Sequence, residues 1–300
     1  QRVSRLDTWY LMYHLGDHVP PLGQFVKVMP PKDRFWADPH IVARNGKYYV
    51  FVEEYLYKKK RGHISVIEID SSGTWRPPVA VLEQDYHLSY PHVFAWQDSY
   101  FMVPESAAHA TIDLYECTAF PYQWEFRMSL MQNIVAVDST LFYHHDRWWL
   151  FTGIADPAQA LPHVELSLFF SRELCSTEWQ PHPWNPLVSD VRKARCAGSI
   201  FARGDRLYRP SQDCSRIYGF GFDLNEILML SDKEYQERTA ASVRPDWDEE
   251  TQATHTFASA GRLTMVDAFM RRSRCGEAPA WLKRAAASRR AYRDPGDAPS

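Results

Sequence analysis

The sequence predicts an all-β fold, namely a five-bladed β-propeller with four antiparallel strands in each blade. The main observation is a segment that recurs five times along the chain, at intervals of 48 to 59 residues. Each copy has an apolar residue four positions after its first residue and a turn residue, Gly or Asp, eight positions after it. An apolar run follows every turn, so each copy has the pattern strand, tight turn, strand. A repeat of about this length that carries several short strands indicates a propeller.

The five copies account for the strands in chain order. Their first residues are Asp38, Tyr90, Asp138, Ala197 and Ala253. The apolar runs after the turns cover 48–52, 100–103, 148–152, 207–208 and 263–266, and further strand-like runs cover 63–69, 112–117 and 165–171. The fifth copy is the weakest because a basic tail follows it, so we expect residues 8–14 to supply a closing strand. A two-sheet sandwich is the alternative architecture.

This pattern divides the chain into three parts. Residues 1–32 form an N-terminal lead, residues 33–270 the propeller, and residues 271–300 a basic, partly disordered tail. Residues 271–293 hold eight Lys or Arg against one acidic residue. We expect the tail to be solvated, partly helical and dispensable for the propeller, although it could also contact nucleic acid or an anionic membrane. The remainder of the chain is acidic, which argues against a nucleic-acid partner.

Composition sets further limits. Hydrophobic residues make up 45% and charged residues 24% of the chain, as in globular proteins. No apolar run is long enough to span a membrane, and the first twenty residues lack a signal-peptide core. Five cysteines without a Cys-x-x-Cys pair argue against a disulfide framework or a zinc site and predict free thiols in the cytoplasm. We expect a monomer, and the absence of an initial Met indicates that the sequence could be part of a longer chain.

Acidic residues occupy equivalent places in the repeats. Asp38 and Asp138 begin the first and third copies, and Glu53 and Glu105 lie fifteen positions after the first residues of the first and second. Residues that open the inner strands of blades point at the central funnel, so we expect these carboxylates to converge there. Glycoside cleavage requires a protonated and an ionised carboxyl group on opposite sides of a bond. The alternatives are a structural Ca²⁺ site and, for each Asp, a turn cap.

Seven further residues are candidates for contacts to a substrate: Trp36, His40, His92, Arg209, Gln212, Asp213 and His255. The three histidines share one repeat position and could form a ring of hydrogen bonds or a metal site, or be buried between blades. The guanidinium of Arg209 could bind an anionic group or form a structural salt bridge with Asp213 or Asp38. Trp36 could be a platform for a sugar or part of the core. We expect no resident cofactor or catalytic metal.

Several runs resemble known families. The run Phe35-Trp36-Ala37-Asp38-Pro39-His40, with Val137-Asp138-Ser139, resembles the five-bladed propellers of glycoside hydrolase families 43 and 32. Residues 87–92, 102–105, 114–117 and 209–214 more closely resemble the N-terminal propeller domain of plant glucosamine inositolphosphorylceramide transferases and its bacterial relatives. The resemblance covers about residues 33–257. In the plant transferases a separate domain carries out glycosyl transfer.

The resemblance to family 43 implies roles for three carboxylates. It makes Asp38 the general base and Asp138 the residue that tunes the acid. The acid of that family opens the fourth blade, where this chain has Ala197 in Arg195-Cys196-Ala197-Gly198. Either Glu105 has taken over as the acid, or the domain binds glycans without cleaving them. We therefore expect a glycosidase-like, carbohydrate-active propeller, with a non-catalytic glycan-recognition domain of a glycosyltransferase system as the alternative and a pure interaction scaffold as a third reading.

Overall fold

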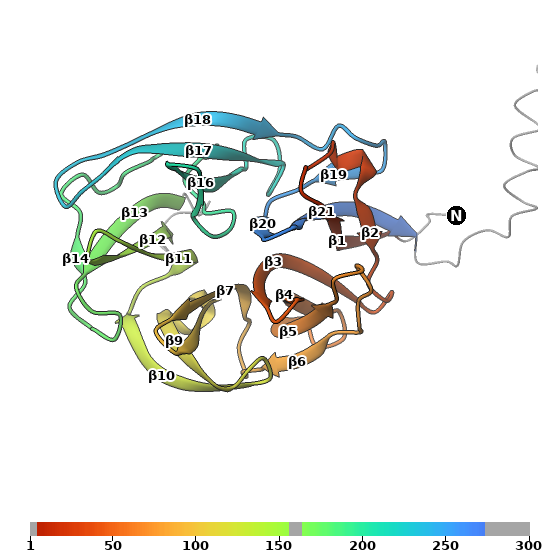
Figure 1. Cartoon of the computed structure of the whole chain (residues 1–300), viewed down its shortest axis with the longest axis horizontal. Coiled ribbons are helices and arrows are strands. Elements are labelled where there is room, and N and C mark those ends of the chain that lie inside the picture. The colour runs from red at the N-terminus through yellow and green to blue at the C-terminus, as the bar shows by residue number, and fades with distance from the viewer. Residues whose placement is uncertain (1–4, 156–163, 274–300) are drawn as a thin grey trace, which may run out of the picture. The chain divides into compact units, whose positions relative to one another are not determined.

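The computed structural model describes residues 5–155 and 164–273. The chain divides into a unit of residues 8–270, which contains the propeller, and a second unit formed by residues 1–7 and 271–300. In the first unit five β-sheets surround a central axis, as Figure 1 shows. Beside the strands, the described residues contain two short 3-10 helices, η1 (Leu22–Gln24) and η2 (Ala107–His109). The predicted fold class is confirmed.

Four blades are antiparallel sheets of four consecutive strands. Blade 1 consists of β3 (Arg34–Arg44), β4 (Lys47–Leu56), β5 (Arg61–Ile69) and β6 (Val79–Leu82). Blade 2 consists of β7 (Ser89–Trp96), β8 (Ser99–Ser106), β9 (Thr111–Ala119) and β10 (Gln123–Gln132). Blade 3 consists of β11 (Ala136–His144), β12 (Arg147–Ala155), β13 (Val164–Ser171) and β14 (Gln180–Pro181). Blade 4 consists of β15 (Phe201–Arg203), β16 (Arg206–Asp213), β17 (Gly221–Leu230) and β18 (Tyr235–Val243).

The fifth blade joins the two ends of the propeller. Its inner segments β19 (Thr251–Ala253) and β20 (Phe257–Ala260) pair with β21 (Leu263–Ser273). The next strands are β1 (Arg5–Leu15) and β2 (Val26–Val28), so the N-terminal segment supplies the outer half of this blade. Figure 1 shows the red and blue ends of the colour range side by side there. Strand β21 runs past residue 270, and the rest of the expected basic tail, 274–300, lies outside the described residues.

The core lies between neighbouring blades. Each of the five larger apolar clusters combines side chains from adjacent sheets, for example Val42 and Phe51 of blade 1 with Val93 and Met102 of blade 2. Apolar strands with both faces buried stabilise the ring because each sheet covers the next. No helix among the described residues is long and apolar enough to span a membrane.

A bulge opens the inner strand of the first three blades. The register with the second strand shifts between Ala37 and His40, between Ser89 and His92, and between Val137 and Thr140. Inside these shifts Asp38, Tyr90 and Asp138 have φ of 54°, 42° and 52°. An extra residue in this left-handed conformation bends the strand and redirects its side chain. The bulge therefore positions the residues that were singled out as repeat starts.

The first hairpin of each blade shows that the sequence alignment placed the fifth copy one residue too early. In blades 1 to 4 the repeat start lies six residues before the pair that closes the first hairpin, as with Asp38 and Arg44. In blade 5 the closing pair is Ala260 and Leu263, so the equivalent residue is Thr254 rather than Ala253. The sequence predicted that His255 shares the repeat position of His40 and His92, and this prediction is wrong. Thr256 shares that position instead.

Candidate functional site

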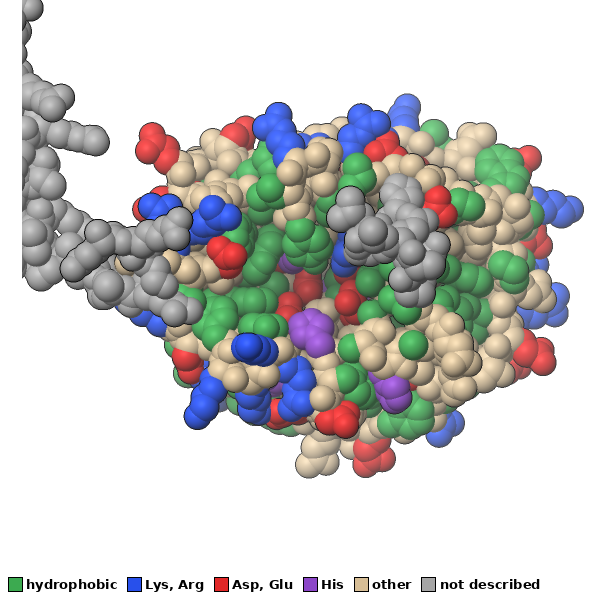
Figure 2. All heavy atoms as spheres, turned by 180° about the vertical axis from the view of Figure 1, so that it is seen from behind, with side chains coloured by type: hydrophobic (Ala, Val, Ile, Leu, Met, Phe, Trp, Pro, Cys, Tyr) green, Lys and Arg blue, Asp and Glu red, His purple; other side chains and the backbone are tan. Residues whose placement is uncertain are grey.

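Five acidic side chains gather near the axis. They are Asp38, Glu53, Glu105, Asp138 and Asp267, and we call this set the acidic funnel. Figure 2 shows acidic side chains and a histidine around a hollow at the centre of one face. Glu105 is partly buried and the other four are buried. The structure thus brings together the three residues that the sequence proposed as catalytic.

Asp38 is held by groups from two neighbouring blades. Its Oδ1 accepts a hydrogen bond from the Thr256 hydroxyl at 2.9 Å, and its Oδ2 accepts one from the Tyr90 backbone N–H at 3.2 Å. Burial and the nearby charges of Asp267 and Asp138 raise the pKa of Asp38 to about 6, although His255 opposes the shift. This carboxyl group is therefore mostly ionised at neutral pH.

Asp138 is bound by two side chains of blade 4 and its inner loop. Its Oδ2 accepts hydrogen bonds from Nε of Arg195 at 2.7 Å and from Nε2 of Gln212 at 3.2 Å. The guanidinium of Arg195 also lies over the ring of Tyr218, 5.1 Å from its centroid. Gln212 is fully buried and donates to the Cys196 carbonyl as well, so it orients Asp138 rather than facing a ligand.

Glu105 and Glu53 face the same space. The Oε2 atom of Glu105 accepts a hydrogen bond from the Asp138 backbone N–H at 3.2 Å and lies 3.9 Å from Arg195. Burial, with the charge of Asp138, raises the pKa of Glu105 to about 8. Burial and the charges of Asp38 and Glu105 also raise the pKa of Glu53 well above its usual range. With a pKa of about 8, Glu105 is largely protonated at neutral pH and can donate a proton.

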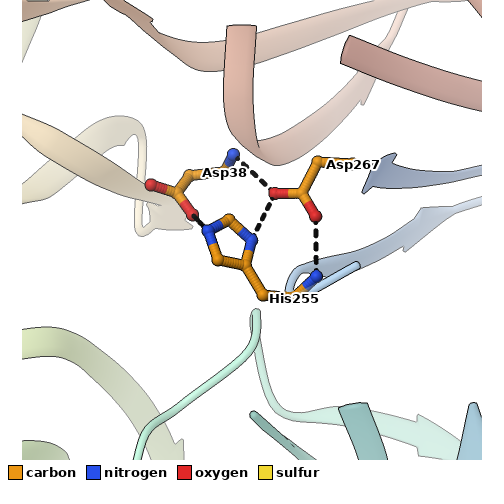
Figure 3. A group of neighbouring side chains, drawn as sticks. All are labelled: Asp38, His255 and Asp267. Atoms are coloured by element: carbon orange, nitrogen blue, oxygen red, sulfur yellow. Dashed lines mark hydrogen bonds and ion pairs between the residues drawn. The ribbon is translucent and has the colours of Figure 1, made fainter. Parts of the chain in front are cut away.

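His255 and Asp267 form a pair beside Asp38, drawn in Figure 3. The Nδ1 atom of His255 lies 2.6 Å from Oδ2 of Asp267, and its Nε2 lies 3.7 Å from Oδ1 of Asp38. Burial alone would lower the pKa of His255, but the charges of Asp267 and Asp38 raise it overall. Those contacts also hold the pKa of Asp267 below its usual range despite its burial.

Histidines 40 and 92 are buried neutral rings. Burial lowers the pKa of His40 to about 3 and that of His92 to about 4. Nδ1 of His40 contacts the Asp38 carbonyl at 3.2 Å, so it carries the hydrogen, and Nε2 of this ring is buried without a hydrogen-bond partner among the described residues. Nε2 of His92 bonds the Leu141 carbonyl at 2.9 Å. Of the three predicted histidines, only His255 meets the funnel carboxylates.

Arg209 and Asp213 lie in structural ion pairs. Arg209 is fully buried, and its guanidinium contacts both carboxylate oxygens of Glu237 at 2.8 and 2.6 Å. This leaves it no surface for a substrate, and its partner is neither Asp213 nor Asp38. Asp213 instead pairs with Arg244 at 2.9 Å. Trp36 is buried in a core cluster and donates its indole N–H to Glu54, so it offers no exposed platform.

Sequence reasoning missed Asp267, Arg195 and Trp9. Asp267 is a lone carboxylate in the apolar run Leu263–Met270, which was a usable signal. In the corrected register Asp267 is equivalent to Phe51 of blade 1, so the repeat itself does not point to it. Arg195 lies two residues before Ala197, where the other copies have no charged residue, and Trp9 stacks on His255 at 4.0 Å from the opposite end of the chain.

Asp38, His255 and Asp267 are close enough together to hold a metal ion. One ligand atom from each lies within 4.8 Å of the others. The oxygen and nitrogen atoms concerned already make the hydrogen bonds and ion pairs described above, so a cation would have to replace them. We assign no ion to this group, and a structural Ca²⁺ in the funnel stays a prediction.

Comparison with known proteins identifies a family. Residues 25–267 match the model described as "Glucosamine inositolphosphorylceramide transferase 1, N-terminal". The enzyme of that name from Arabidopsis thaliana is 32% identical over 206 residues, and the one from Oryza sativa subsp. japonica is 31% identical over the same length. These alignments cover 68% of this chain but 27% of each plant enzyme, so the chain spans about a quarter of their length.

Solved structures share the fold at low identity. The catalytic domain of a family 62 α-L-arabinofuranosidase from Coprinopsis cinerea has a TM-score of 0.59 and 11% identity, covering 87% of this chain and 96% of that one. A family 117 glycoside hydrolase from Zobellia galactanivorans has a TM-score of 0.55 and 11% identity, covering 93% and 98%. The family 32 β-fructofuranosidase of Bombyx mori has a TM-score of 0.54 and 14% identity, covering 89% and 58%.

Proposed function

Since the chain belongs to the family of N-terminal domains of glucosamine inositolphosphorylceramide transferase 1, we propose that its acidic funnel binds a sugar and cleaves a glycosidic bond. In this proposal Glu105 is the general acid, Asp38 is the general base or nucleophile, and Asp138 tunes the acid. The relatives' name supports a glycan ligand, and their remaining domains lie outside the aligned part.

The observation that carries the proposal is the difference in protonation between Glu105 and Asp38. The pKa of Glu105 is raised to about 8 and that of Asp38 to about 6, so near pH 7 one group holds a proton and the other is mostly ionised. Glycoside cleavage needs these two states on either side of the scissile bond. Glu105 would protonate the leaving oxygen while Asp38 activates water or attacks the anomeric carbon.

Asp138 supports the acid through two contacts. Its backbone N–H binds Glu105, and its carboxylate holds Arg195 near the same oxygen. The negative charge of Asp138 favours the protonated form of Glu105, while Arg195 favours the ionised form that remains after proton transfer. This balance suits a group that must both hold and release a proton.

A second function is favoured by Ala197. This residue is fully buried at the place in blade 4 where the first residue of the repeat lies, and a methyl group can neither donate nor accept a proton. If Glu105 does not reach the leaving oxygen, the funnel would recognise a glycan without cleaving it. The chemistry would then belong to the remainder of the transferase.

The test is a glycan array, followed by turnover assays on every glycan that binds. We expect binding by the wild-type chain and release of sugar that Asp38→Asn or Glu105→Gln reduces by about 100-fold or more. Glu116→Gln, a partly exposed glutamate of blade 2, is the matched control and should leave release unchanged. Binding without release would support the recognition module, and the absence of both would support a scaffold.

A further inference from the structure

Asp267 is ionised on geometric grounds. Its Oδ1 accepts hydrogen bonds from the backbone N–H groups of His255 and Thr256 at 2.9 and 3.0 Å. Its Oδ2 accepts one from the backbone N–H of Asp38 at 3.0 Å and lies 2.6 Å from Nδ1 of His255. Three backbone N–H donors stabilise the charged form of this carboxylate, so in its short contact with His255 the carboxylate accepts and the ring donates. The Nδ1 atom of His255 therefore carries hydrogen.

The imidazole ring of His255 is fixed on several sides. Trp9 stacks on it with centroids 4.0 Å apart and planes 13° apart, and the ring of Tyr218 is perpendicular to it with centroids 5.3 Å apart. Gly219 packs so closely that a Cβ there would lie 2.8 Å from the His255 side chain. An aromatic face beside the ring also favours a cationic imidazolium. The ring thus has one orientation, with Nε2 towards Asp38.

Thr256 links the pair to Asp38. Its hydroxyl donates to Oδ1 of Asp38 at 2.9 Å, so its oxygen is free to accept from Nδ1 of His255 at 3.2 Å. The backbone N–H of Asp38 also donates to Asp267. Asp38 is therefore connected to His255 and Asp267 both through its carboxylate and through its backbone.

We propose that His255, held as an imidazolium by Asp267, is the positioning residue that keeps the Asp38 carboxylate ionised and aimed into the funnel. Two carboxylates, Asp38 and Asp267, border one ring, and a single positive charge there offsets part of their repulsion. The assignment of Asp38 as the reacting base rests on the proposed function. The electrostatic role of His255 does not, because it is defined by contacts within the fold.

Every other charged group near Asp38 acts against this effect or is engaged elsewhere. Glu53 from β4, Glu105 from β8 and Asp138 from β11 are acidic, and their ionisation would disfavour the charge on Asp38. Arg195 is bound to Asp138, and His87 lies 3.5 Å from Glu53 with its pKa lowered by burial. Tyr218, whose ring is perpendicular to that of His255, is neutral at ordinary pH because burial raises its pKa well above its usual range. His255 is therefore the main source of positive charge for Asp38.

The experiment measures protonation directly by NMR, with no substrate. In the wild-type chain, ring ¹⁵N shifts should show His255 protonated on both nitrogens at pH 7. In Asp267→Asn the ring should be neutral at that pH. In His255→Asn, the new amide can keep the hydrogen bond to Asp267. The pKa of Asp38, followed by the ¹³C shift of its carboxyl carbon, should rise by about 1–3 units.

His92→Gln is the matched control. His92 is equally buried, but its pKa is lowered to about 4, so its replacement removes no charge at pH 7. The pKa of Asp38 should stay within a few tenths of a unit in this variant. A neutral His255 in the wild-type chain, which needs no variant to be observed, would overturn the proposal. So would an unchanged pKa of Asp38 in a folded His255→Asn.

A second readout separates this inference from the proposed function. If a glycan substrate is found, the acidic limb of its kcat/KM profile should move to higher pH in His255→Asn together with the pKa of Asp38. If no substrate is found but the NMR shifts occur, the proposed cleavage fails while the role of His255 stands. If turnover occurs and the NMR shifts do not, the role proposed for His255 fails while the proposed cleavage stands.

Discussion

At the scale of single residues, the bulge at the start of the inner strand in blades 1 to 3 places Asp38, Tyr90 and Asp138 near the axis. Asp38 and Asp138 adopt positive φ, which aspartate tolerates better than most residues, and their carboxylates reach the axis. Tyr90 occupies the same bulge in blade 2 and is buried, with its hydroxyl bonded to Thr140 and to the backbone N–H of Gly198. One backbone conformation thus serves both charged and structural side chains.

Gly198 is the residue whose replacement should disturb the site most for the smallest chemical change. It has φ of 131°, and a Cβ there would lie 2.1 Å from the Phe257 carbonyl oxygen of the next blade. Because backbone faces backbone, neither side can yield easily. We expect Gly198→Ala to lower the free energy of unfolding by about 3 kcal/mol or more.

Gly204→Ala is the control for that measurement. Gly204 also has positive φ, 64°, but has open space around it. Its replacement should cost about 1–2 kcal/mol, for backbone strain alone. Denaturant unfolding of both variants gives the comparison, and equal losses would show that the contact with Phe257 is unimportant.

At the scale of elements, the sequence predicted the blades because their apolar spacing repeats. The first three copies aligned without error, and they led to Asp38, Glu105 and Asp138. The fifth copy was placed one residue early, since a period read from sequence cannot see that His255 and Thr256 lie in the connection between β19 and β20. Asp267 was missed because its position in the repeat is apolar in the other blades, as at Phe51 and Val103. Arg209 was misjudged because the alternation of a strand does not reveal a partner, Glu237, two strands away.

The closing strand β1 is expected to be essential for folding. Its residues 8–13 are all buried, and its Tyr10 hydroxyl bonds Thr251 at 2.7 Å across the length of the chain. Removing residues 1–28 would uncover β21 and the apolar clusters on both sides of blade 5. We expect the shortened chain to lose its cooperative thermal transition, and a peptide of residues 5–28 added in trans to restore it.

A chain that ends at residue 273 is the companion to that test. The removed residues 274–300 are rich in Arg and Ala and have no strand alternation in their sequence. We expect the Tm to stay within a few degrees. A large decrease in Tm would contradict the division drawn from the sequence.

At the scale of the whole molecule, the ring brings acidic residues that are up to 229 positions apart into one partly buried space. Burial raises the pKa of Glu105 and Asp38, and this links stability to pH. A carboxyl group whose pKa is higher in the folded than in the unfolded chain binds protons more tightly when folded. Folding is then less favourable as pH rises from the unfolded value to the folded one.

The stability of the wild-type chain should therefore fall between about pH 4.5, the ordinary pKa of a glutamate, and about pH 8, the folded value of Glu105. Glu105→Gln resembles the protonated acid and should lose less stability over that range. The variant should be close to wild type at pH 5 and more stable than wild type at pH 9. Thermal unfolding across pH gives the result, and a parallel pH dependence of both chains would mean that Glu105 is not protonated in the fold.

The most direct test is to measure how the loss of hydrolysis rate in Glu105→Gln depends on the leaving group of the glycoside. A natural sugar alcohol must be protonated as it leaves, whereas an activated phenol of low pKa leaves unaided. If Glu105 is the acid, Glu105→Gln should lose about 100- to 10,000-fold in rate on the natural glycan and far less on the activated aryl glycoside, while Asp38→Asn loses rate on both. Equal losses on the two substrates in Glu105→Gln, or no loss on either, would contradict the assignment of acid and base in this funnel.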